Sequence, residues 1–375
     1  MHLSLDDAQA FLASAVHFSD EKLARAQPAP EHPLSATQAQ ALSLDAQQLG
    51  LLPQAQSGFA LWEHHDSPGA MIFNIGLLQA LAEVNSSLAL AWHRQALAMA
   101  VLKACQQEVA SDNPLDLTLL STGHFGLGRL SLARYWSRPK GQKLEAEHEL
   151  YLQDYFDRQQ EAVLLAPESW QELLWPVWHE GEVRLQRLMR CDLAVTQERR
   201  QHGMDDLRAF LVKEQSRTEP LLLDHPTLCA QDLYRMLLLQ DLIGLLAIGA
   251  GALARAERQT QAYTALRKQG GHSIAQHPAV MQMLAQIAGA RMAAQHELER
   301  FSRPVAAITL AEVLHARWRI QPLLCAAASD AMQAHGGVGY MRDIGVEKVF
   351  REQNTLRVLS GGLLDIPLVL QALAT

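Results

Sequence analysis

The stretch that decides the fold runs from Gln333 to Gly362 and reads QAHGGVGYMRDIGVEKVFREQNTLRVLSGG. It begins with a Gly-Gly turn followed by an aromatic residue, and it ends with a second Gly-Gly pair. Glycines in such a turn let the backbone approach a ligand closely, and free N–H groups there suit a phosphate. Between the two pairs, apolar residues recur at helical spacing, which predicts a helix. On these residues alone, a ligand-binding turn and a tightly packed helix connection are equally open.

The same stretch resembles the C-terminal signature of the acyl-CoA dehydrogenase family. That signature is a Gln-x-x-Gly-Gly-x-Gly-Tyr turn, then a Val-Glu-x-x-x-Arg helix, then a loop that carries the catalytic glutamate. The matching residues are Gln333, Gly336, Gly337, Gly339, Tyr340, Val346, Glu347, Arg351, Leu356 and Arg357. Glu352 stands where the family usually has aspartate. A weaker resemblance, ALAEVNSSLAL, lies at residues 80–90.

Composition indicates an ordinary globular chain. It has 375 residues, of which 49% are apolar and 19% charged, as in typical soluble proteins. The net charge of −8 argues against nucleic-acid binding. The four cysteines lack metal-ligand spacing, so reduced thiols and no metal site are expected. The N-terminus lacks the features of a signal peptide, and the longest apolar run, 242–254, is too short to cross a bilayer. A cytoplasmic protein is predicted.

The order of patterns along the chain predicts an α+β, mostly α protein. Helical periodicity fills the first part, with a helix start at Ser4 and a break near Asn85. Four runs with alternating apolar residues predict strands, namely Leu144–Leu152, Glu161–Ala166, Glu180–Val195 and Leu207–Val212. Helical periodicity returns from Pro226. By the resemblance, these parts are an N-terminal helical domain (1–112), a middle β-domain (113–222) and a C-terminal four-helix-bundle domain (223–375).

A second candidate binding motif is RKQGGHSIAQH, from Arg267 to His277. Two basic residues beside a Gly-Gly turn suit an anion, although a solvated helix corner is an equal alternative. The resemblance implies that Arg267 contacts the diphosphate of an FAD in a neighbouring subunit, with His277 close to that flavin. The residues assigned to the cofactor are Arg267, His277, Gln333, Gly336, Gly337 and Gly362. Gly270 replaces the phenylalanine usual at this turn. A flavin shared in this way implies a homodimer or homotetramer.

The β-domain departs from the family pattern where the isoalloxazine ring is usually held. The family has a Thr-Glu-Pro-x-x-Gly-Ser loop and a Trp-x-Thr strand there. This chain has STGHFG at residues 121–126 and Leu-Tyr-Leu at residues 150–152. Compared with the Trp-x-Thr strand, the segment at residues 150–152 therefore lacks the threonine hydroxyl and the tryptophan ring that would stack on the flavin.

The catalytic position is also altered. Removing an α-proton while a β-hydride leaves to flavin needs a base whose pKa lies near the working pH, such as a carboxylate whose pKa burial has raised. The family's glutamate position holds Ser360, which is too weak a base without an adjacent histidine, although its backbone N–H can still polarise a thioester carbonyl.

Some members carry the base on an earlier helix, at the position of Asp241. A carboxylate inside MLLLQDLIGLLAIG is costly to bury, which makes Asp241 the candidate base. A structural role, facing a polar loop or paired with Arg235 or His225, is the alternative. Asp365 is a weaker candidate.

Three functions follow as hypotheses, because a fold does not fix a function. The first is an FAD-dependent acyl-CoA dehydrogenase-like oxidoreductase of lipid metabolism that acts on acyl-CoA or another acyl thioester and passes electrons to an electron-transfer flavoprotein. The second is a catalytically silent homologue that binds acyl thioesters or acts as partner subunit in a hetero-oligomer with a glutamate-bearing homologue. The third is a flavin monooxygenase on the same fold.

Overall fold

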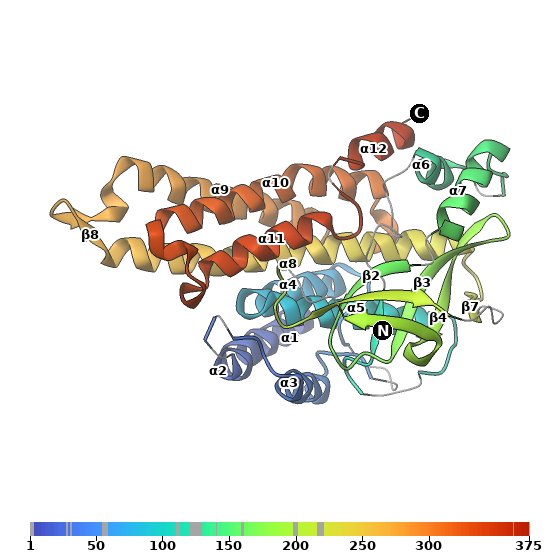
Figure 1. Cartoon of the computed structure of the whole chain (residues 1–375), viewed down its shortest axis with the longest axis horizontal. Coiled ribbons are helices and arrows are strands. Elements are labelled where there is room, and N and C mark those ends of the chain that lie inside the picture. Colours follow the sequence, from blue (N-terminus) through green and yellow to red (C-terminus); the bar gives the residue numbers. More distant parts are fainter. Residues whose placement is uncertain are drawn as a thin grey trace.

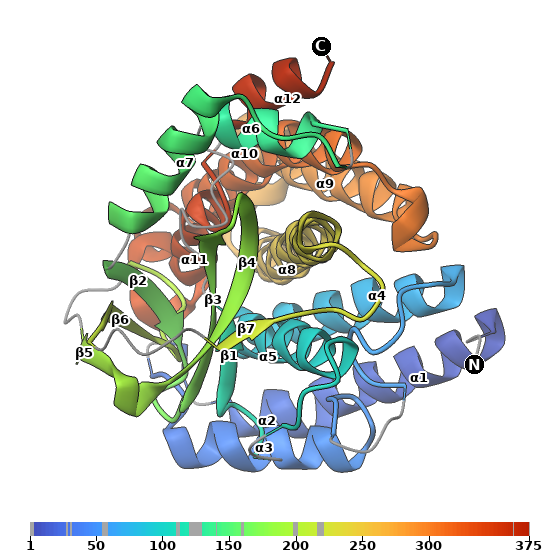
Figure 2. The ribbon, with the colours of Figure 1, turned by 90° about the vertical axis from the view of Figure 1, so that its right-hand side faces the viewer.

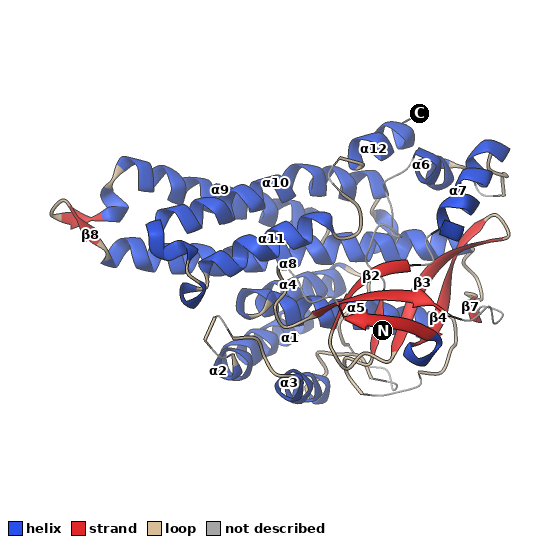
Figure 3. Cartoon of the chain, in the orientation of Figure 1, coloured by secondary structure: helices blue, strands red, loops and turns tan. Residues whose placement is uncertain are grey.

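The structure is a computed structural model, and it describes residues 4–27, 29–30, 32–54, 59–109, 113–119, 130–139, 141–158, 161–197, 202–215, 221–362 and 364–374. Long helices run side by side along its longest axis, and the larger β-sheets lie against one end of them (Figure 1). The same arrangement is seen with elements coloured by type (Figure 3). The predicted mostly helical α+β architecture is confirmed.

The N-terminal helices form as their capping residues indicate. Ser4 accepts a hydrogen bond from the Asp7 backbone N–H and caps the first helix, as predicted. Asn85 ends one helix and caps the next through Leu88 N–H, which confirms the predicted break. These helices are α1 (Leu5–Phe18), a π-helical turn η1 (Ser19–Leu23), α2 (Ala24–Ala26), α3 (Ala36–Gln48), α4 (Pro68–Val84) and α5 (Ser86–Ala104).

Helix α8 (Ala230–Leu266, 37 residues) is the axis of the molecule. It packs against α4, α5, α9, α10 and α11, and Figure 2 shows it nearly end-on with the other elements around it. By length and composition it could cross a membrane, but 94% of its most apolar window is buried inside this molecule. It is therefore a core helix. The later helices are α9 (Pro278–Arg300), α10 (Leu310–Ala334), α11 (Val346–Val358) and α12 (Ile366–Ala374), with short 3-10 turns η4 (Ile274–Gln276), η5 (Val305–Ala307), η6 (Gly336–Tyr340) and η7 (Arg342–Ile344).

Glycines on α8 allow its neighbours to approach closely. A Cβ at Gly251 would lie 2.3 Å from the Gln79 carbonyl oxygen on α4. A Cβ at Gly244 would lie 2.1 Å from the His93 ring on α5. Both distances are shorter than real contacts allow. Glycine at position 251 therefore lets α4 pack against α8, and glycine at position 244 does the same for α5.

Two sheets form the β-region, with strand orders β1-β3-β4-β7 and β2-β6-β5. Within each sheet the neighbours are antiparallel except the parallel pair β1–β3. A small hairpin, β8–β9, stands apart at the far end of α8. The strands are β1 (Leu117–Leu119), β2 (Glu161–Ala166), β3 (Glu172–His179), β4 (Glu182–Met189), β5 (Leu193–Gln197), β6 (Arg208–Glu214), β7 (Leu221–Leu223), β8 (Lys268–Gln269) and β9 (His272–Ser273). The larger sheets thus occupy the range of the predicted β-domain, whose boundaries remain a prediction.

One predicted strand is wrong. Residues 144–152 belong largely to helix α7 (Ala146–Arg158), which follows α6 (Leu130–Ser137). The buried residues of α7, Leu152 and Phe156, are four apart, which is helical spacing, whereas Leu150 is exposed. The Leu-Tyr-Leu segment at 150–152 is therefore helical and cannot be the predicted ring-binding strand.

Candidate functional site

Asp241 lies in a cluster of polar side chains between α8, α5 and the turn after α11. His93 Nε2 is 3.1 Å from one carboxylate oxygen of Asp241, and Arg94 Nη2 is 3.2 Å from the same oxygen. The Ser360 hydroxyl donates to the other oxygen and accepts from Arg94 Nη2 at 3.2 Å. The two positions at which the sequence indicates a base, Asp241 and Ser360, are thus in direct contact.

The cluster is sealed from solvent. His93, Asp241 and Ser360 are 0% exposed, and Arg94 is 1% exposed. Gly244 lets the His93 ring lie directly on the surface of α8. These four side chains are therefore enclosed almost completely by the rest of the chain.

Trp62 fixes the tautomer of His93. The indole Nε1–H of Trp62 lies 2.8 Å from His93 Nδ1, and an indole nitrogen can only donate. His93 Nδ1 therefore accepts, and the ring proton sits on Nε2, where it donates to Asp241. Burial lowers the pKa of His93 despite its carboxylate neighbour, so the imidazole is neutral.

Asp241 is an ionised carboxylate. Burial alone would raise its pKa, but the Arg94 charge and the hydrogen bonds from His93 and Ser360 outweigh burial and lower the pKa below the usual aspartate value. A general base needs the opposite shift, toward the working pH. The cluster therefore stabilises the anion and makes it a poor proton acceptor.

Arg317 on α10 holds the turn that carries Ser360. Its Nη2 donates to the carbonyl oxygens of Leu356, at 2.8 Å, and Leu359, which the end of α11 leaves free. Burial lowers the pKa of Arg317 to about 10. Ser360 itself has φ +55, a left-handed conformation that is uncommon for a residue with a side chain. Several contacts thus define this turn.

The structural partners suggested by the sequence for Asp241 are wrong. Arg235 pairs with Asp232 instead, at 3.1 Å. His225 accepts from the backbone N–H of Leu228 at 2.9 Å. The weaker candidate, Asp365, lies near Gly362, whose added Cβ would be 3.6 Å from its carboxylate.

A second site is a cleft of about 760 Å³ where α8 ends. Its lining includes five residues assigned to the cofactor, namely Arg267, His277, Gln333, Gly336 and Gly337. The sixth, Gly362, is not among the lining residues and lies beside Ser360 instead. The cleft therefore joins the two glycine turns that the sequence singled out, from segments before α9 and after α10.

The lining of this cleft suits a diphosphate. Arg267 is exposed, Gly270 and Gly336 have φ of +63 and +64, and no atom lies within 4 Å of a Cβ built on Gly337. Because Gly337 has neither positive φ nor a crowding neighbour, its glycine suits the close approach of a group outside this chain. The described residues fit the diphosphate end of FAD. For the ring end, residues 121–126 lie outside the described residues, and residues 150–152 are helical.

Other motif residues dock α11 to its neighbours. Arg351 donates to both carboxylate oxygens of Asp205, at 2.6 and 2.8 Å, and to Glu347 at 2.6 and 3.0 Å. These bonds raise the pKa of Arg351 even though burial lowers it. Glu352 pairs with Arg255 on α8 at 2.7 Å. The Val-Glu-x-x-x-Arg motif therefore has a structural role here.

The sequence interpretation missed Trp62, His93 and Arg94. The available signal was the pair His93-Arg94 inside the apolar segment SSLALAWHRQALAMAVL of α5. Both residues are buried in a helix that is buried almost all round, and buried charges need partners.

Comparison with known proteins shows that the fold is that of acyl-CoA dehydrogenases of known structure. Residues 238–363, from α8 to the turn after Ser360, match the family model for the acyl-CoA dehydrogenase C-terminal domain. No curated protein sequence matches the chain.

Solved structures share the fold over the full length. Butyryl-CoA dehydrogenase from Megasphaera elsdenii has a TM-score of 0.66 at 14% identity, covering 99% of both chains. Glutaryl-CoA dehydrogenase from Mycobacterium smegmatis has a TM-score of 0.71 at 13% identity, covering 100% of this chain and 95% of the other. The prolyl acyl carrier protein oxidase AnaB has a TM-score of 0.69 at 13% identity, covering 97% of both chains.

Proposed function

We propose that this chain works in an FAD-dependent oxidoreductase of the acyl-CoA dehydrogenase type, which introduces an α,β double bond into an acyl thioester in the cytoplasm. The observation that carries the proposal is the cleft in which Arg267, His277 and the Gln333–Gly337 turn meet. FAD supplies hydride-accepting chemistry when bound. Arg267 would neutralise its diphosphate, and the Gly336-Gly337 backbone would approach it closely.

The geometry of α8 favours a flavin shared between subunits. At about 1.5 Å per residue, Arg267 lies about 39 Å along the helix from Asp241. One dinucleotide bound at Arg267 therefore does not reach the Asp241 cluster of the same chain. We infer that the cleft serves a flavin whose reactive ring belongs to a neighbouring subunit.

Within this assembly we assign Asp241 a structural role. Its carboxylate accepts hydrogen bonds from His93 and Ser360 and forms an ion pair with Arg94, its pKa is lowered, and it is 0% exposed. Such a group neither reaches a substrate nor readily takes up a proton. The chain is then a partner subunit, and a glutamate-bearing homologue supplies the base.

A second candidate is that Asp241 itself is the base. The observation that favours it is the contact between Asp241 and Ser360, because these two positions carry the base in the resembled family. Arg94 and Ser360 would then have to leave the carboxylate when the substrate binds, which would raise its pKa.

The cofactor half of the proposal is tested by flavin content. The chain is purified alone and with a co-expressed glutamate-bearing homologue, and FAD released per subunit is measured. We expect Arg267→Gln to weaken FAD binding about tenfold, the effect of one lost charge-assisted hydrogen bond of about 1.4 kcal/mol. Arg258→Gln is the matched control, since Arg258 lies on the same helix and pairs with Glu83. A protein without flavin in both preparations would overturn the proposal.

The two roles of Asp241 are separated by Asp241→Asn in the flavin-loaded assembly. A structural role predicts a large loss of stability, with turnover per folded, flavin-bearing molecule within about tenfold of wild type. A variant of unchanged stability whose acyl-CoA-dependent flavin reduction falls at least about a thousandfold would instead establish Asp241 as the base.

A further inference from the structure

Two neighbouring hollows lie on the face of α8 that points away from Asp241. The first measures about 290 Å³, and the second about 320 Å³. His65 and Met236 line both, so the hollows adjoin one another. On α8, Asp232, Met236 and Leu239 share this face at helical spacing, whereas Asp241 is about 200° around the axis from Leu239.

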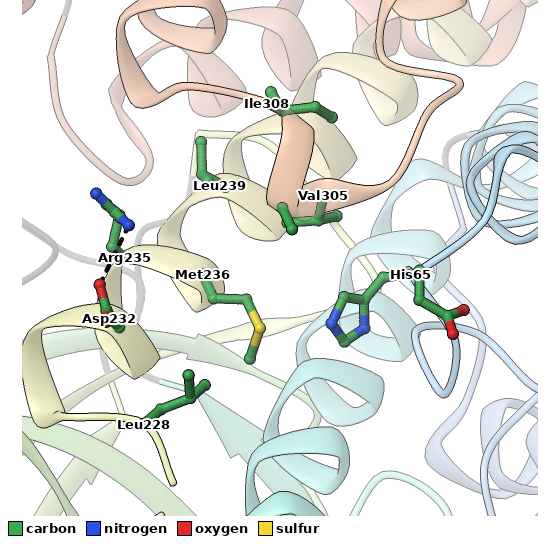
Figure 4. A pocket seen from close by; sticks show the side chains of 10 residues that line it. His65, Leu228, Asp232, Arg235, Met236, Leu239, Val305 and Ile308 are labelled. Carbon is green, nitrogen blue, oxygen red and sulfur yellow. Dashed lines mark hydrogen bonds and ion pairs between the residues drawn. The ribbon is translucent and has the colours of Figure 1, made fainter.

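The walls of the hollows are mostly apolar. Figure 4 shows Leu228, Met236 and Leu239 from α8 and the segment before it, near Val305 and Ile308 from η5 and the segment after it, with His65 to one side. The second hollow continues along α5 past Ala100 and Ala104 to Trp62. The second hollow also has Glu63, His64 and Lys103 in its wall, so the aliphatic part of the combined lining lies mainly at the first hollow.

Two buried polar atoms along this space have no hydrogen-bond partner among the described residues. Gln240, 2% exposed, lines the second hollow, and its Nε2 is unpartnered. His65 Nδ1 is unpartnered as well, at the junction of the two hollows. Buried amide donors in proteins almost always have an acceptor. An acceptor brought by a ligand would satisfy Gln240.

The charged groups around the hollows are already paired. Lys103 pairs with Glu63 at the second hollow, and Arg235 pairs with Asp232 at 3.1 Å at the first (Figure 4). Burial lowers the pKa of His65, although Asp66 opposes this, so the ring adds no positive charge near pH 7. An ionic ligand would have to break one of these pairs, and a neutral one would not.

We propose that the two hollows form a binding site for a small, neutral aliphatic carbonyl compound, a medium-chain ketone or ester. Its carbonyl oxygen accepts from Gln240 Nε2, and its chain lies against Met236 toward Leu228 and Val305. This site is separate from the flavin cleft and from the Asp241 cluster, and it does not depend on the proposed function.

The site contacts the Asp241 cluster through one residue. Trp62 lines the second hollow, and its indole N–H donates to His93, which donates to Asp241. A ligand against Trp62 therefore changes the surroundings of an indole that is otherwise fully buried. Tryptophan emission provides an optical signal for binding.

The full chain is titrated with 2-octanone and, in a second arm, with methyl heptanoate. Calorimetry and tryptophan emission measure the binding in both arms. We expect saturable binding of one ligand per chain, and the tighter of the two probes identifies the ketone or the ester as the class. Gln240→Leu, which keeps the size but removes the amide, should weaken binding at least tenfold. Ala100→Phe should fill the second hollow and abolish binding, while Ala13→Phe, exposed on α1, should leave it unchanged.

Thermal unfolding checks that each variant folds. If Ala100→Phe does not fold, Ala104→Leu in the last turn of α5 narrows the same hollow and should weaken binding. Non-saturable heats with both probes would overturn the proposal, because they mean that the hollows hold water alone. Equal affinity of Gln240→Leu and wild type would also overturn it, since the carbonyl would then have no partner there.

Discussion

Asp241 has hydrogen-bond donors at both carboxylate oxygens inside a cluster without solvent. The cluster holds one anion, Asp241, and one full cation, Arg94, because His93 is neutral, and the buried Arg317 adds a second cation close by. Arg94 Nε and Nη1 already lack partners among the described residues. The neutralisation of Asp241 would therefore leave a buried guanidinium with no compensating charge.

We expect Asp241→Asn to lower the free energy of unfolding by about 3–5 kcal/mol, the usual cost of breaking a buried ion pair from one side. Ser360→Ala removes the hydrogen bonds to Asp241 and from Arg94 but no charge, and it should cost about 2 kcal/mol, or about 1 kcal/mol for each bond. Urea unfolding of both variants measures the difference. Equal costs would mean that the ion pair contributes little to the stability of this cluster.

The neutral His93 makes stability depend on pH. Its folded pKa lies below the ordinary value of 6.5, so below pH 6.5 the unfolded chain binds a proton that the folded chain does not. The free energy of unfolding should therefore fall as the pH drops from 7 toward 5. Two charged groups face His93, namely Asp241 and Arg94, and both stay ionised between pH 7 and pH 5. Asp241, whose pKa is also lowered, destabilises the fold on acidification only near pH 4 and below.

Urea unfolding at several pH values tests this for wild type and His93→Gln, whose amide can still contact Trp62 and Asp241 without titrating. The stability difference between the two proteins should shrink between pH 7 and pH 5. His65 and His335 also have lowered pKa values, so the variant keeps a smaller slope of its own. A difference that stays constant would contradict a neutral buried His93.

At the residue scale, sequence reasoning could find a carboxylate but not its partners. Asp241 is conspicuous because an acidic residue interrupts an apolar segment. Ser360 is conspicuous because the C-terminal motif places it where the resembled family has its catalytic glutamate. Arg94 and His93 come from α5, and no spacing in the sequence relates α5 to α8. The choice between base and structural anion depended on these partners, which tertiary packing alone provides.

At the element scale, α11 is tied to the chain just before β6 by Arg351 and Asp205. Their side chains are 13% and 25% exposed, and the contact is bidentate, a geometry that strengthens such pairs. We expect a double-mutant cycle of Arg351→Met and Asp205→Ala to give a coupling free energy of about 1–3 kcal/mol. Urea unfolding of the four proteins measures it, and additive effects would show that the pair does not stabilise this docking.

Helices and strands were predictable where the spacing of apolar residues was regular over a long segment. The α4–α5 break follows from the Asn85 cap, and the existence of a long helix at α8 follows from its apolar spacing. Helix α7 was taken for a strand because a short amphipathic helix and a short strand give similar apolar patterns. Strand β3 was missed because its first five residues are all buried, so the alternation that marks a half-exposed strand is absent.

At the scale of the whole molecule, α8 keeps the sites apart. The Asp241 cluster lies on one face of its first half, the first hollow lies on the opposite face with the second hollow beside it at Gln240, and the proposed flavin cleft lies beyond its C-terminus. Because α8 is buried along most of its length, it holds these sites at fixed separations. A flavin in the cleft can meet an active centre only if another subunit brings that centre there.

We therefore expect flavin retention to depend on subunit association. On dilution, the fraction of protein that keeps FAD should fall together with the fraction that sediments as an oligomer, because each cleft holds one end of the cofactor. Sedimentation velocity recorded at both flavin and protein wavelengths measures the two fractions in one experiment. Arg267→Gln should lose flavin at concentrations where the assembly is still intact, and Arg258→Gln should follow wild type. Flavin that stays on a dissociated single chain would contradict the shared site and would place the whole cofactor within one subunit.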